Sequence, residues 1–332
     1  MLNAPVTRSL RNPFAAAVFA LSVAGTICST PALAADWPQR PVRFILPFGP
    51  GSAADTVARV LGDNLSARWG QPVVVENKPG ADGLIAIRAV IAANDDHMLL
   101  ITSTGSFLAH PYMQAKLDYD LDRDLAPVAR IADTLLVVGV PSTLEAANLA
   151  QFVQLARARP ELNLSASAGL TEFAVDAFIK QEGLKTARVP YKELAAAARD
   201  LGEGRIHLLL TSYAVVRPFV EAGKVKIIAA GTRERSALTK DIPSISESGY
   251  PILAAETSTV ALSGGQMPEA LRKKIASDII AALNEPKVRE RVALTGQDVA
   301  PSGPDDLAAL VKQQSAKVDG IAQVVGLGKG GN

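Results

Sequence analysis

Residues 41–61, PVRFILPFGPGSAADTVARVL, predict a strand, a turn and a helix in immediate succession. Residues 42–46 are mostly β-branched, aromatic or aliphatic, and their side chains alternate in the way that favours a short strand. Residues 47–52 then interrupt the strand, because their two prolines lack an amide donor and their two glycines tolerate a positive φ. From Ala53 the apolar side chains recur at helical spacing, so we expect a helix to begin there.

This strand–turn–helix unit is a candidate anion site. A helix that starts at a Gly-rich turn directs free backbone N–H groups and the positive helix end to one point. A carboxylate or a phosphate binds at such a point without any catalytic residue. An ordinary strand–helix turn has the same pattern, so both interpretations stay open. Asp55 also has two interpretations, as a contact to a ligand's amine or water or as a first-turn acid of the helix.

The composition is that of a folded globular protein. The chain has 332 residues, of which 48% are hydrophobic and 20% are charged, which is enough for two domains with their own cores. The formal net charge of +1 gives no reason to expect nucleic acid or an acidic membrane surface as a partner. Aromatic residues make up 5% of the chain, which argues against stacking platforms for single strands.

The first 34 residues have the pattern of a signal peptide. Two arginines precede an apolar stretch, residues 14–27, that is too short for a comfortable permanent membrane anchor. An Ala-Leu-Ala cleavage site follows and ends at Ala34. We therefore expect cleavage near Ala34 and an exported, soluble mature chain. Cys28, the only cysteine, lies inside this segment, which leaves the mature chain without disulfides or thiolate metal sites.

Beyond the signal peptide, strand-like and helical stretches alternate, as is typical of α/β proteins. Two further polar loops that contain glycine end predicted strands. Residues 103–106 follow a strand predicted over 98–102, and residues 168–172 follow a strand predicted over 163–167. Open α/β sheets bind their ligands at loops of this kind, at the carboxyl ends of strands. These loops therefore join the turn before Ala53 as candidate binding segments.

A series of short motifs runs in order through the mature chain, from Trp37 to Val325. They are WPQRPVR (37–43), PFGPGSAAD (47–55), VVENKPGA (74–81), LAPV (125–128), ASAG (166–169), VPYK (189–192), AGK (222–224) and DIPS (241–244). With these motifs the chain resembles the periplasmic solute-binding proteins of tripartite tricarboxylate transporters, often called the Bug family.

The resemblance implies an α/β, two-lobed periplasmic-binding-protein fold of type II, in which each lobe is a mixed sheet flanked by helices. Lobe 1 would combine residues 35–136 and 258–325, and lobe 2 would span residues 137–257. Residues 326–332 would form a flexible tail. The two crossings between the lobes would make a hinge that closes the protein on a small ligand.

The resemblance also implies a function. The protein would bind a small organic anion, a carboxylate, in the periplasm and deliver it to the membrane permease subunits of a tripartite tricarboxylate-type transporter, working as a monomer. The alternative is a periplasmic sensor or accessory protein that reports a ligand to a signalling partner. No enzyme activity, cofactor or metal is expected, because the chain lacks a G-x-S-x-G elbow, a complete dinucleotide fingerprint and metal-ligand spacing among its histidines.

The candidate ligand-binding residues are loop positions that match the family. In lobe 1 they are Phe48, Gly51, Ser52, Ala53, Asp55, Ser103, Thr104 and Ser106. In lobe 2 they are Ser167, Ala168, Gly169, Thr171 and Thr211. Backbone amides, hydroxyls and ordered water would hold the ligand, with the amides of the 51–53 turn on one carboxylate.

The second-lobe loop departs from the family pattern, since it is shorter by about three residues and has Glu172 where a histidine is common. A Glu172 side chain that faces the cleft would oppose a second carboxylate and accept an amine. The other interpretation is a first-turn acid that stabilises its own helix.

Overall fold

The computed structural model describes residues 1, 4, 37–167, 169–191, 193–231 and 239–330. The chain divides into two units, residues 1–37 and 38–332, and every element described below belongs to the second unit. Apart from residues 1 and 4, the predicted signal peptide lies outside the described residues. Ala168, one of the predicted ligand-binding residues, also lies outside them. No helix among the described residues is both long enough and apolar enough to cross a membrane.

The first sheet is built from the beginning and the end of the chain. Its strand order is β11-β4-β10-β3-β1-β2. The strands β1, β2 and β3 run parallel, whereas β10 is antiparallel to both β3 and β4 and β11 is antiparallel to β4. Their bounds are β1 (Val42–Leu46), β2 (Val73–Asn77), β3 (Met98–Ser103), β4 (Leu125–Thr134), β10 (Ser258–Gly264) and β11 (Gln297–Ser302).

The second sheet is built from the middle of the chain, in the order β7-β6-β8-β5-β9. The strands β6, β7 and β8 are parallel, and β5 is antiparallel to β8 and β9. Their bounds are β5 (Leu136–Pro141), β6 (Asn163–Ala166), β7 (Ala187–Arg188), β8 (Leu208–Ser212) and β9 (Val225–Ala230). Both sheets are mixed, as the family resemblance implied.

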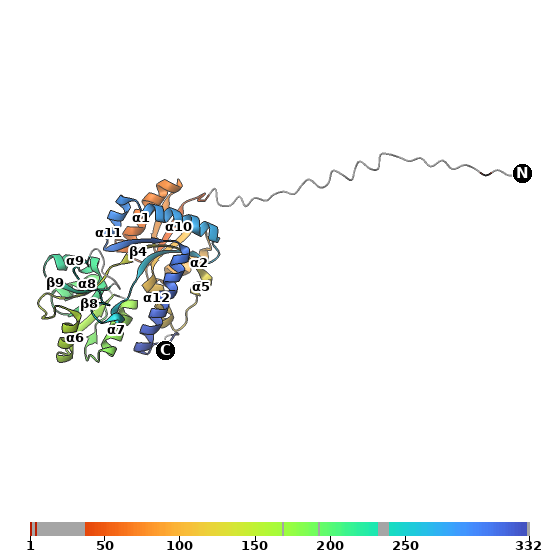
Figure 1. Cartoon of the computed structure of the whole chain (residues 1–332). Helices are drawn as coiled ribbons and strands as arrows, with labels where there is room; N and C mark the ends of the chain where they lie inside the picture. The colour runs from red at the N-terminus through yellow and green to blue at the C-terminus, as the bar shows by residue number, and fades with distance from the viewer. Residues whose placement is uncertain (2–3, 5–36, 168, 192, 232–238, 331–332) are drawn as a thin grey trace. The chain divides into compact units, whose positions relative to one another are not determined.

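Helices flank both sheets. Around the first sheet lie α1 (Ala53–Trp69), α2 (Leu84–Ala93), α10 (Glu269–Leu283) and α11 (Pro286–Ala293), with the short helices α3 (Thr104–Phe107), α4 (His110–Met113) and α5 (Leu121–Asp124). Around the second lie α6 (Leu149–Ala158), α7 (Leu170–Gln181), α8 (Leu194–Gly202) and α9 (Tyr213–Glu221). Figure 1 shows the elements of the second sheet in green, gathered beside the orange and blue elements of the first.

Side chains of the second sheet alternate between two cores, as the period of two along a strand requires. Val137 and Leu209 pack with α8 and α9, whereas Val138 and Leu210 belong to the larger core that includes α6 and α7. That larger core also contains residues of the first sheet and of α12 (Pro304–Val325), which packs against both β4 and α7. Apolar packing through α12 therefore connects the two sheets.

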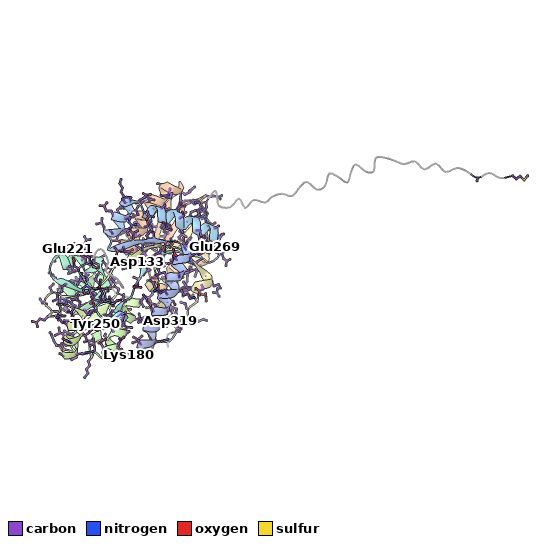
Figure 2. All side chains as sticks on the ribbon, in the orientation of Figure 1. Asp133, Lys180, Glu221, Tyr250, Glu269 and Asp319 are labelled. Atoms are coloured by element: carbon purple, nitrogen blue, oxygen red, sulfur yellow. The ribbon has the colours of Figure 1, made fainter. Side chains whose placement is uncertain are left out.

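The chain passes between the sheets at two neighbouring places. Strand β4 ends at Thr134 and β5 begins at Leu136, while β10 begins at Ser258. The Thr134 amide donates to the Thr257 carbonyl at 2.9 Å, and the Ser258 hydroxyl donates to Asp133, labelled in Figure 2, at 2.7 Å. Hydrogen bonds thus tie the two crossings together, which is compatible with the predicted lobe boundaries at 136 and 258.

Two predictions about elements were incomplete. Strand β11 was missed, because its sequence QDVAPS has one apolar branched residue and a proline, and it pairs only with β4 at the edge of the sheet. Residues 326–330 make contacts that a flexible tail would lack. The Gly330 amide donates to the Pro111 carbonyl at 2.8 Å, and Leu327 packs against the larger core.

Candidate functional site

A cleft of about 810 Å³ is lined by residues of both sheets and their loops. This volume lies in the range of sites that bind small molecules. Eight of the predicted ligand-binding residues line it, and they come from both predicted lobes: Phe48, Ser52, Ala53, Ser103, Ser106, Ser167, Gly169 and Thr171. The loops at the carboxyl ends of β1, β3 and β6 therefore meet at one place, as the sequence predicted for loops of this kind.

Four other predicted residues support the wall of the cleft without lining it. The buried Thr104 hydroxyl accepts the Ser258 amide at 3.0 Å, and the buried Thr211 hydroxyl is hydrogen-bonded to the Ser167 hydroxyl at 2.8 Å. Gly51 and Asp55 bind each other, since the Gly51 amide donates to the Asp55 carboxylate at 2.9 Å. The expectation that the Gly51 amide faces a ligand is therefore wrong.

Asp55 organises the turn before α1. Its carboxylate also accepts from Arg59, at 2.9 and 3.0 Å, and from the Asn77 amide, at 2.9 Å. The same Asn77 amide donates to the Phe48 carbonyl at 2.8 Å. Burial acts to raise the pKa of Asp55, but the hydrogen bonds from Arg59, Gly51 and Asn77 outweigh it and hold that pKa below its ordinary value. The structure thus favours the interpretation of Asp55 as a first-turn acid.

The start of α1 is open towards the cleft. Ser52 is the N-cap, and its hydroxyl accepts the Asp55 amide at 3.2 Å, while its carbonyl accepts the Thr56 amide. Within the described residues, the amides of Ala53 and Ala54 have no hydrogen-bond partner, and both residues line the cleft. These are the orphan N–H groups that every helix start leaves.

Two further helices begin at the cleft. Gly169, the N-cap of α7, lines it with a φ of 88°, and Ser212, the N-cap of α9, lines it as well. The N-terminus of a helix carries a partial positive charge, so α1 from one sheet and α7 and α9 from the other favour an anion between them.

Hydroxyl groups dominate the polar lining of the cleft. Among the described lining residues, Asp82 is the only one with a carboxyl side chain, and no lysine or arginine occurs. The hydroxyl-bearing residues are Ser52, Ser103, Ser106, Thr134, Ser167, Thr171, Tyr191, Ser212, Thr257, Thr259 and Thr295. An anion in this cleft would therefore be held by backbone amides and hydroxyls.

Two glycines allow the lobes to approach at the cleft. A Cβ added to Gly169 would lie 3.2 Å from the carbonyl oxygen of Gly105, and one added to Gly105 would lie 2.4 Å from a methyl group of Thr257. Gly105 belongs to α3 beside the first sheet, whereas Gly169 opens α7 beside the second. Larger residues at these positions would push the two walls apart.

Of the two interpretations of Glu172, the structure favours the first-turn acid of α7. Its carboxylate accepts from Arg188 at 2.7 Å, and Arg188 also donates to Asp176 at 2.6 Å, further along the same helix. Glu172 does not occur among the described residues that line the cleft.

The lining residues that the sequence analysis missed include three groups from loops and strand starts. Residues 80–83 form a loop after β2 whose turn-rich sequence was a usable signal, because it also follows the carboxyl end of a strand. Residues 295–297 precede and begin β11, the strand that was missed. Thr257 and Thr259 flank the start of β10, and no local pattern marks them as binding residues.

The described histidines lie outside the cleft. Asp95, Asp96 and His97 bring potential metal-ligand atoms within 4.8 Å of one another, although their spacing gave no such signal. His97 Nδ1 lies 2.5 Å from an Asp96 oxygen, and its Nε2 accepts the Gln39 amide at 3.2 Å. Arg40 pairs with Asp95 at 2.5 Å. These contacts account for the group without a metal ion.

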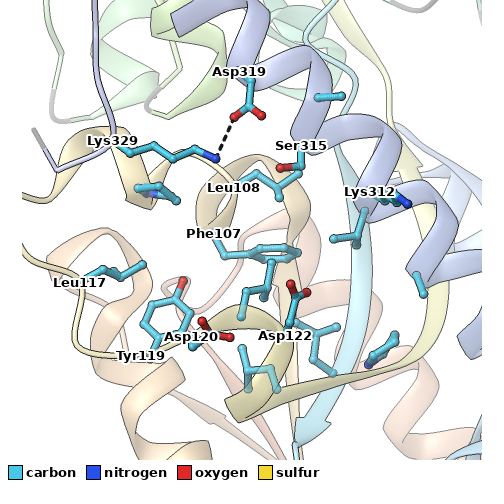
Figure 3. Close-up of a pocket in the computed structure, with 18 of the residues that line it drawn as sticks. Phe107, Leu108, Leu117, Tyr119, Asp120, Asp122, Lys312, Ser315, Asp319 and Lys329 are labelled. Atoms are coloured by element: carbon cyan, nitrogen blue, oxygen red, sulfur yellow. Dashed lines mark ion pairs between the residues drawn. The ribbon is translucent and has the colours of Figure 1, made fainter.

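A second cavity, of about 840 Å³, lies between α12 and the segment that contains α3 to α5; we call it the α12 cavity. Figure 3 shows the Phe107 ring at its centre, with Asp120 and Asp122 on one side and Asp319 on the other. Phe107 and Leu108 are buried and form part of its apolar wall. None of the predicted ligand-binding residues lines this cavity.

Comparison with known families identifies the group to which this fold and cleft belong. The family model for the tripartite tricarboxylate transporter family receptor matches residues 57–327. The chain belongs to this family. Its members are periplasmic receptors, not enzymes, as the sequence motifs led us to expect. The predicted signal peptide itself lies outside the matched residues.

Known proteins agree with this assignment. The chain is 28% identical to BugT of Bordetella pertussis over 316 residues, which cover 93% of this chain and 97% of BugT. It is similar to the structure of Rhodopseudomonas palustris Rpa4515 with adipate, at 26% identity and a TM-score of 0.78, covering 88% of this chain and 99% of the other. It is also similar to the structure of MatC from Rhodopseudomonas palustris with bound malate, at 26% identity and a TM-score of 0.73. That match covers 86% of this chain and 99% of MatC. The predicted two-lobed binding-protein fold is thereby confirmed.

Proposed function

We propose that this receptor binds a small organic carboxylate in the cleft between its two sheets and delivers it to the membrane permease subunits of a tripartite tricarboxylate-type transporter. The observation that carries the proposal is the pair of amides, Ala53 and Ala54, that have no partner among the described residues and lie at the start of α1 in the cleft. Adipate and malate, the ligands of two similar structures, are both carboxylates, which supports the same ligand class here.

In the proposed mechanism one ligand carboxylate accepts hydrogen bonds from the start of α1, and the hydroxyls of Ser52, Ser103 and Ser106 complete that side. The starts of α7 and α9 and the Ser167 hydroxyl approach from the second lobe. A ligand stabilises the closed arrangement only as far as it binds that arrangement better than the open one. Export follows from the proposed cleavage of the signal peptide near Ala34.

The test uses the exported protein, purified from the periplasm, and measures its affinity for malate, succinate and adipate by calorimetry. Ala53→Pro removes one cleft amide while suiting the first position of a helix, and Ser52 already has the extended conformation (φ −66°, ψ 160°) that precedes proline. Ala53→Val adds similar bulk but keeps the amide. A hydrogen bond to a charged group contributes about 1.5–3 kcal/mol, so we expect Ala53→Pro to weaken binding by about 10-fold to 100-fold and Ala53→Val by much less.

Equal affinities of wild type and Ala53→Pro, with the variant still folded, would show that this amide does not hold the ligand. A thermal-shift screen over a wider set of carboxylates precedes the calorimetry. A ligand at about 100 times its Kd adds about 2.7 kcal/mol to the free energy of unfolding, so binding of any of these acids is visible. Absence of any shift across the set would contradict carboxylate binding altogether.

A further inference from the structure

Asp82 differs from the other residues of the cleft lining in carrying a carboxyl group. It supplies the one charged side chain of the described lining, in a cleft where three helix starts favour negative charge. Its carboxylate takes part in no hydrogen bond or ion pair with the described residues. Asp82 is exposed to solvent, so water surrounds its carboxylate when no ligand is bound, and the described lining offers it no partner of opposite charge.

The loop that carries Asp82 is held in an unusual backbone conformation. Ala81 and Asp82 have φ values of 47° and 52°, in the left-handed region that residues other than glycine rarely adopt. A Cβ added to the neighbouring Gly83 would lie 3.2 Å from Pro47, so this loop packs directly against the turn that leads to α1. Backbone strain that the surrounding structure maintains is concentrated at functional sites.

A buried histidine holds this conformation from behind. His110 is fully buried, and its Nε2 donates to the Asp82 carbonyl at 2.9 Å, while its Nδ1 lies 2.9 Å from the Tyr119 hydroxyl. Because a carbonyl only accepts, Nε2 carries the proton and Nδ1 accepts from Tyr119. Burial lowers the pKa of His110, so the ring is neutral when it makes these contacts. The Asp82 backbone is therefore fixed at the wall of the cleft.

We propose that Asp82 binds a cationic group of the ligand, so that the preferred ligands are zwitterionic amino carboxylates. This inference rests on the proposed function, since the carboxylate of the same molecule would bind at the start of α1. A plain dicarboxylate would place its second negative charge against Asp82, whereas an ammonium group in that position gains a charge-assisted hydrogen bond. We therefore assign to Asp82 the amine-binding role that the sequence analysis considered for Glu172.

The experiment compares ligands of equal chain length with and without an amine. The probes are pentanoate, 2-aminopentanoate, 5-aminopentanoate and glutarate, and calorimetry measures each affinity for the wild-type protein. We expect at least one of the two amino carboxylates to bind about tenfold or more tightly than both pentanoate and glutarate. The two positions of the amine allow for either distance between Asp82 and the start of α1.

Asp82→Asn tests the residue itself, because asparagine tolerates the left-handed conformation and removes only the charge. The control is Asp122→Asn, the same change at an exposed aspartate of the α12 cavity. We expect Asp82→Asn to abolish the preference for the amino carboxylate and to improve glutarate binding, and Asp122→Asn to change neither.

The outcomes separate the two proposals. Equal binding of pentanoate and the amino carboxylates by the wild type, or an unchanged preference in Asp82→Asn, would overturn the role of Asp82 while leaving carboxylate binding intact. Failure of all four probes and of the wider carboxylate set would instead overturn the proposed function.

Discussion

The cleft and the α12 cavity have nearly the same volume, about 810 and 840 Å³, yet their walls are made of different groups. In the cleft, helix starts and hydroxyls line the wall, and the amides of Ala53 and Ala54 are without partners in the described part of the chain. In the α12 cavity, apolar side chains share the wall with the charged side chains of Asp120, Asp122, Lys312, Asp319 and Lys329, and Asp319 is engaged by Tyr112 and, at 3.3 Å, by Lys329. Since the two volumes are nearly equal, the kind of polar group distinguishes the cleft: amides at helix starts and hydroxyls line it, whereas the polar wall of the α12 cavity consists mainly of charged side chains.

The two cavities share one short helix. Gly105 and Ser106 of α3 line the cleft, whereas Phe107 of the same helix and the following Leu108 line the α12 cavity. The two small or polar residues of this segment thus line the ligand cleft, and the two apolar residues that follow them line the α12 cavity. If this assignment is right, substitutions on the two sides should separate ligand binding from stability.

The largest effect is expected for Phe107→Ala. Phe107 is 2% exposed, and removing a buried phenylalanine side chain lowers the free energy of unfolding by about 3–5 kcal/mol. The matched control is Phe48→Ala on the cleft wall, where the side chain is half-buried; its loss of stability should be smaller and its loss of carboxylate affinity larger. Urea denaturation and calorimetry measure the two quantities. Equal destabilisation by the two substitutions would contradict the distinction between the cavities.

A smaller effect is expected for Asp55→Asn, which weakens the network that shapes the turn before α1. Losing charge-assisted hydrogen bonds at a buried carboxylate should lower the free energy of unfolding by about 1–3 kcal/mol. Asp63→Asn, at a well-exposed position of the same helix, is the control and should change stability by less than about 0.5 kcal/mol. Similar losses for both would mean that the network is not stabilising.

The pH dependence of that loss follows from the lowered pKa of Asp55 in the folded protein. The stabilisation is complete above the pKa of the unfolded chain, about 3.9, and is lost as the pH falls through the lower folded value. The difference in unfolding free energy between wild type and Asp55→Asn should therefore be constant near neutral pH and shrink below about pH 4. A difference that grew on acidification would show that the pKa is raised instead.

The smallest effect is expected for Lys329→Met at the rim of the α12 cavity. Lys329 pairs with Asp319 at 3.3 Å, with the Lys329 side chain well exposed and that of Asp319 partly exposed, so the pair should contribute less than about 1 kcal/mol. Neither the unfolding free energy nor carboxylate affinity should change measurably. A clear loss of carboxylate affinity would mean that the α12 cavity influences the cleft through α3, and the comparison between them would need revision.

Much of the fold could be predicted because apolar patterns record burial. Strand β1 and helix α1 lie where the spacing of their side chains indicated, strands β3 and β6 lie close to the predicted ranges, and the two mixed sheets agree with what the family resemblance implied. Strand β11 could not be predicted in this way, since a polar edge strand depends on pairing with β4, which is distant in the sequence.

The candidate site, like the fold, could be predicted only in part from the sequence. The sequence alone determined that loops at the ends of β1, β3 and β6 carry polar, glycine-containing segments, because turn chemistry is local. Only the tertiary structure decided which groups remain free in the cleft. The Gly51 amide is bound by Asp55, Glu172 is bound by Arg188, and Asp82 is left in the lining. Such choices depend on the distances between segments far apart in the chain, and those distances exist only after the chain has folded.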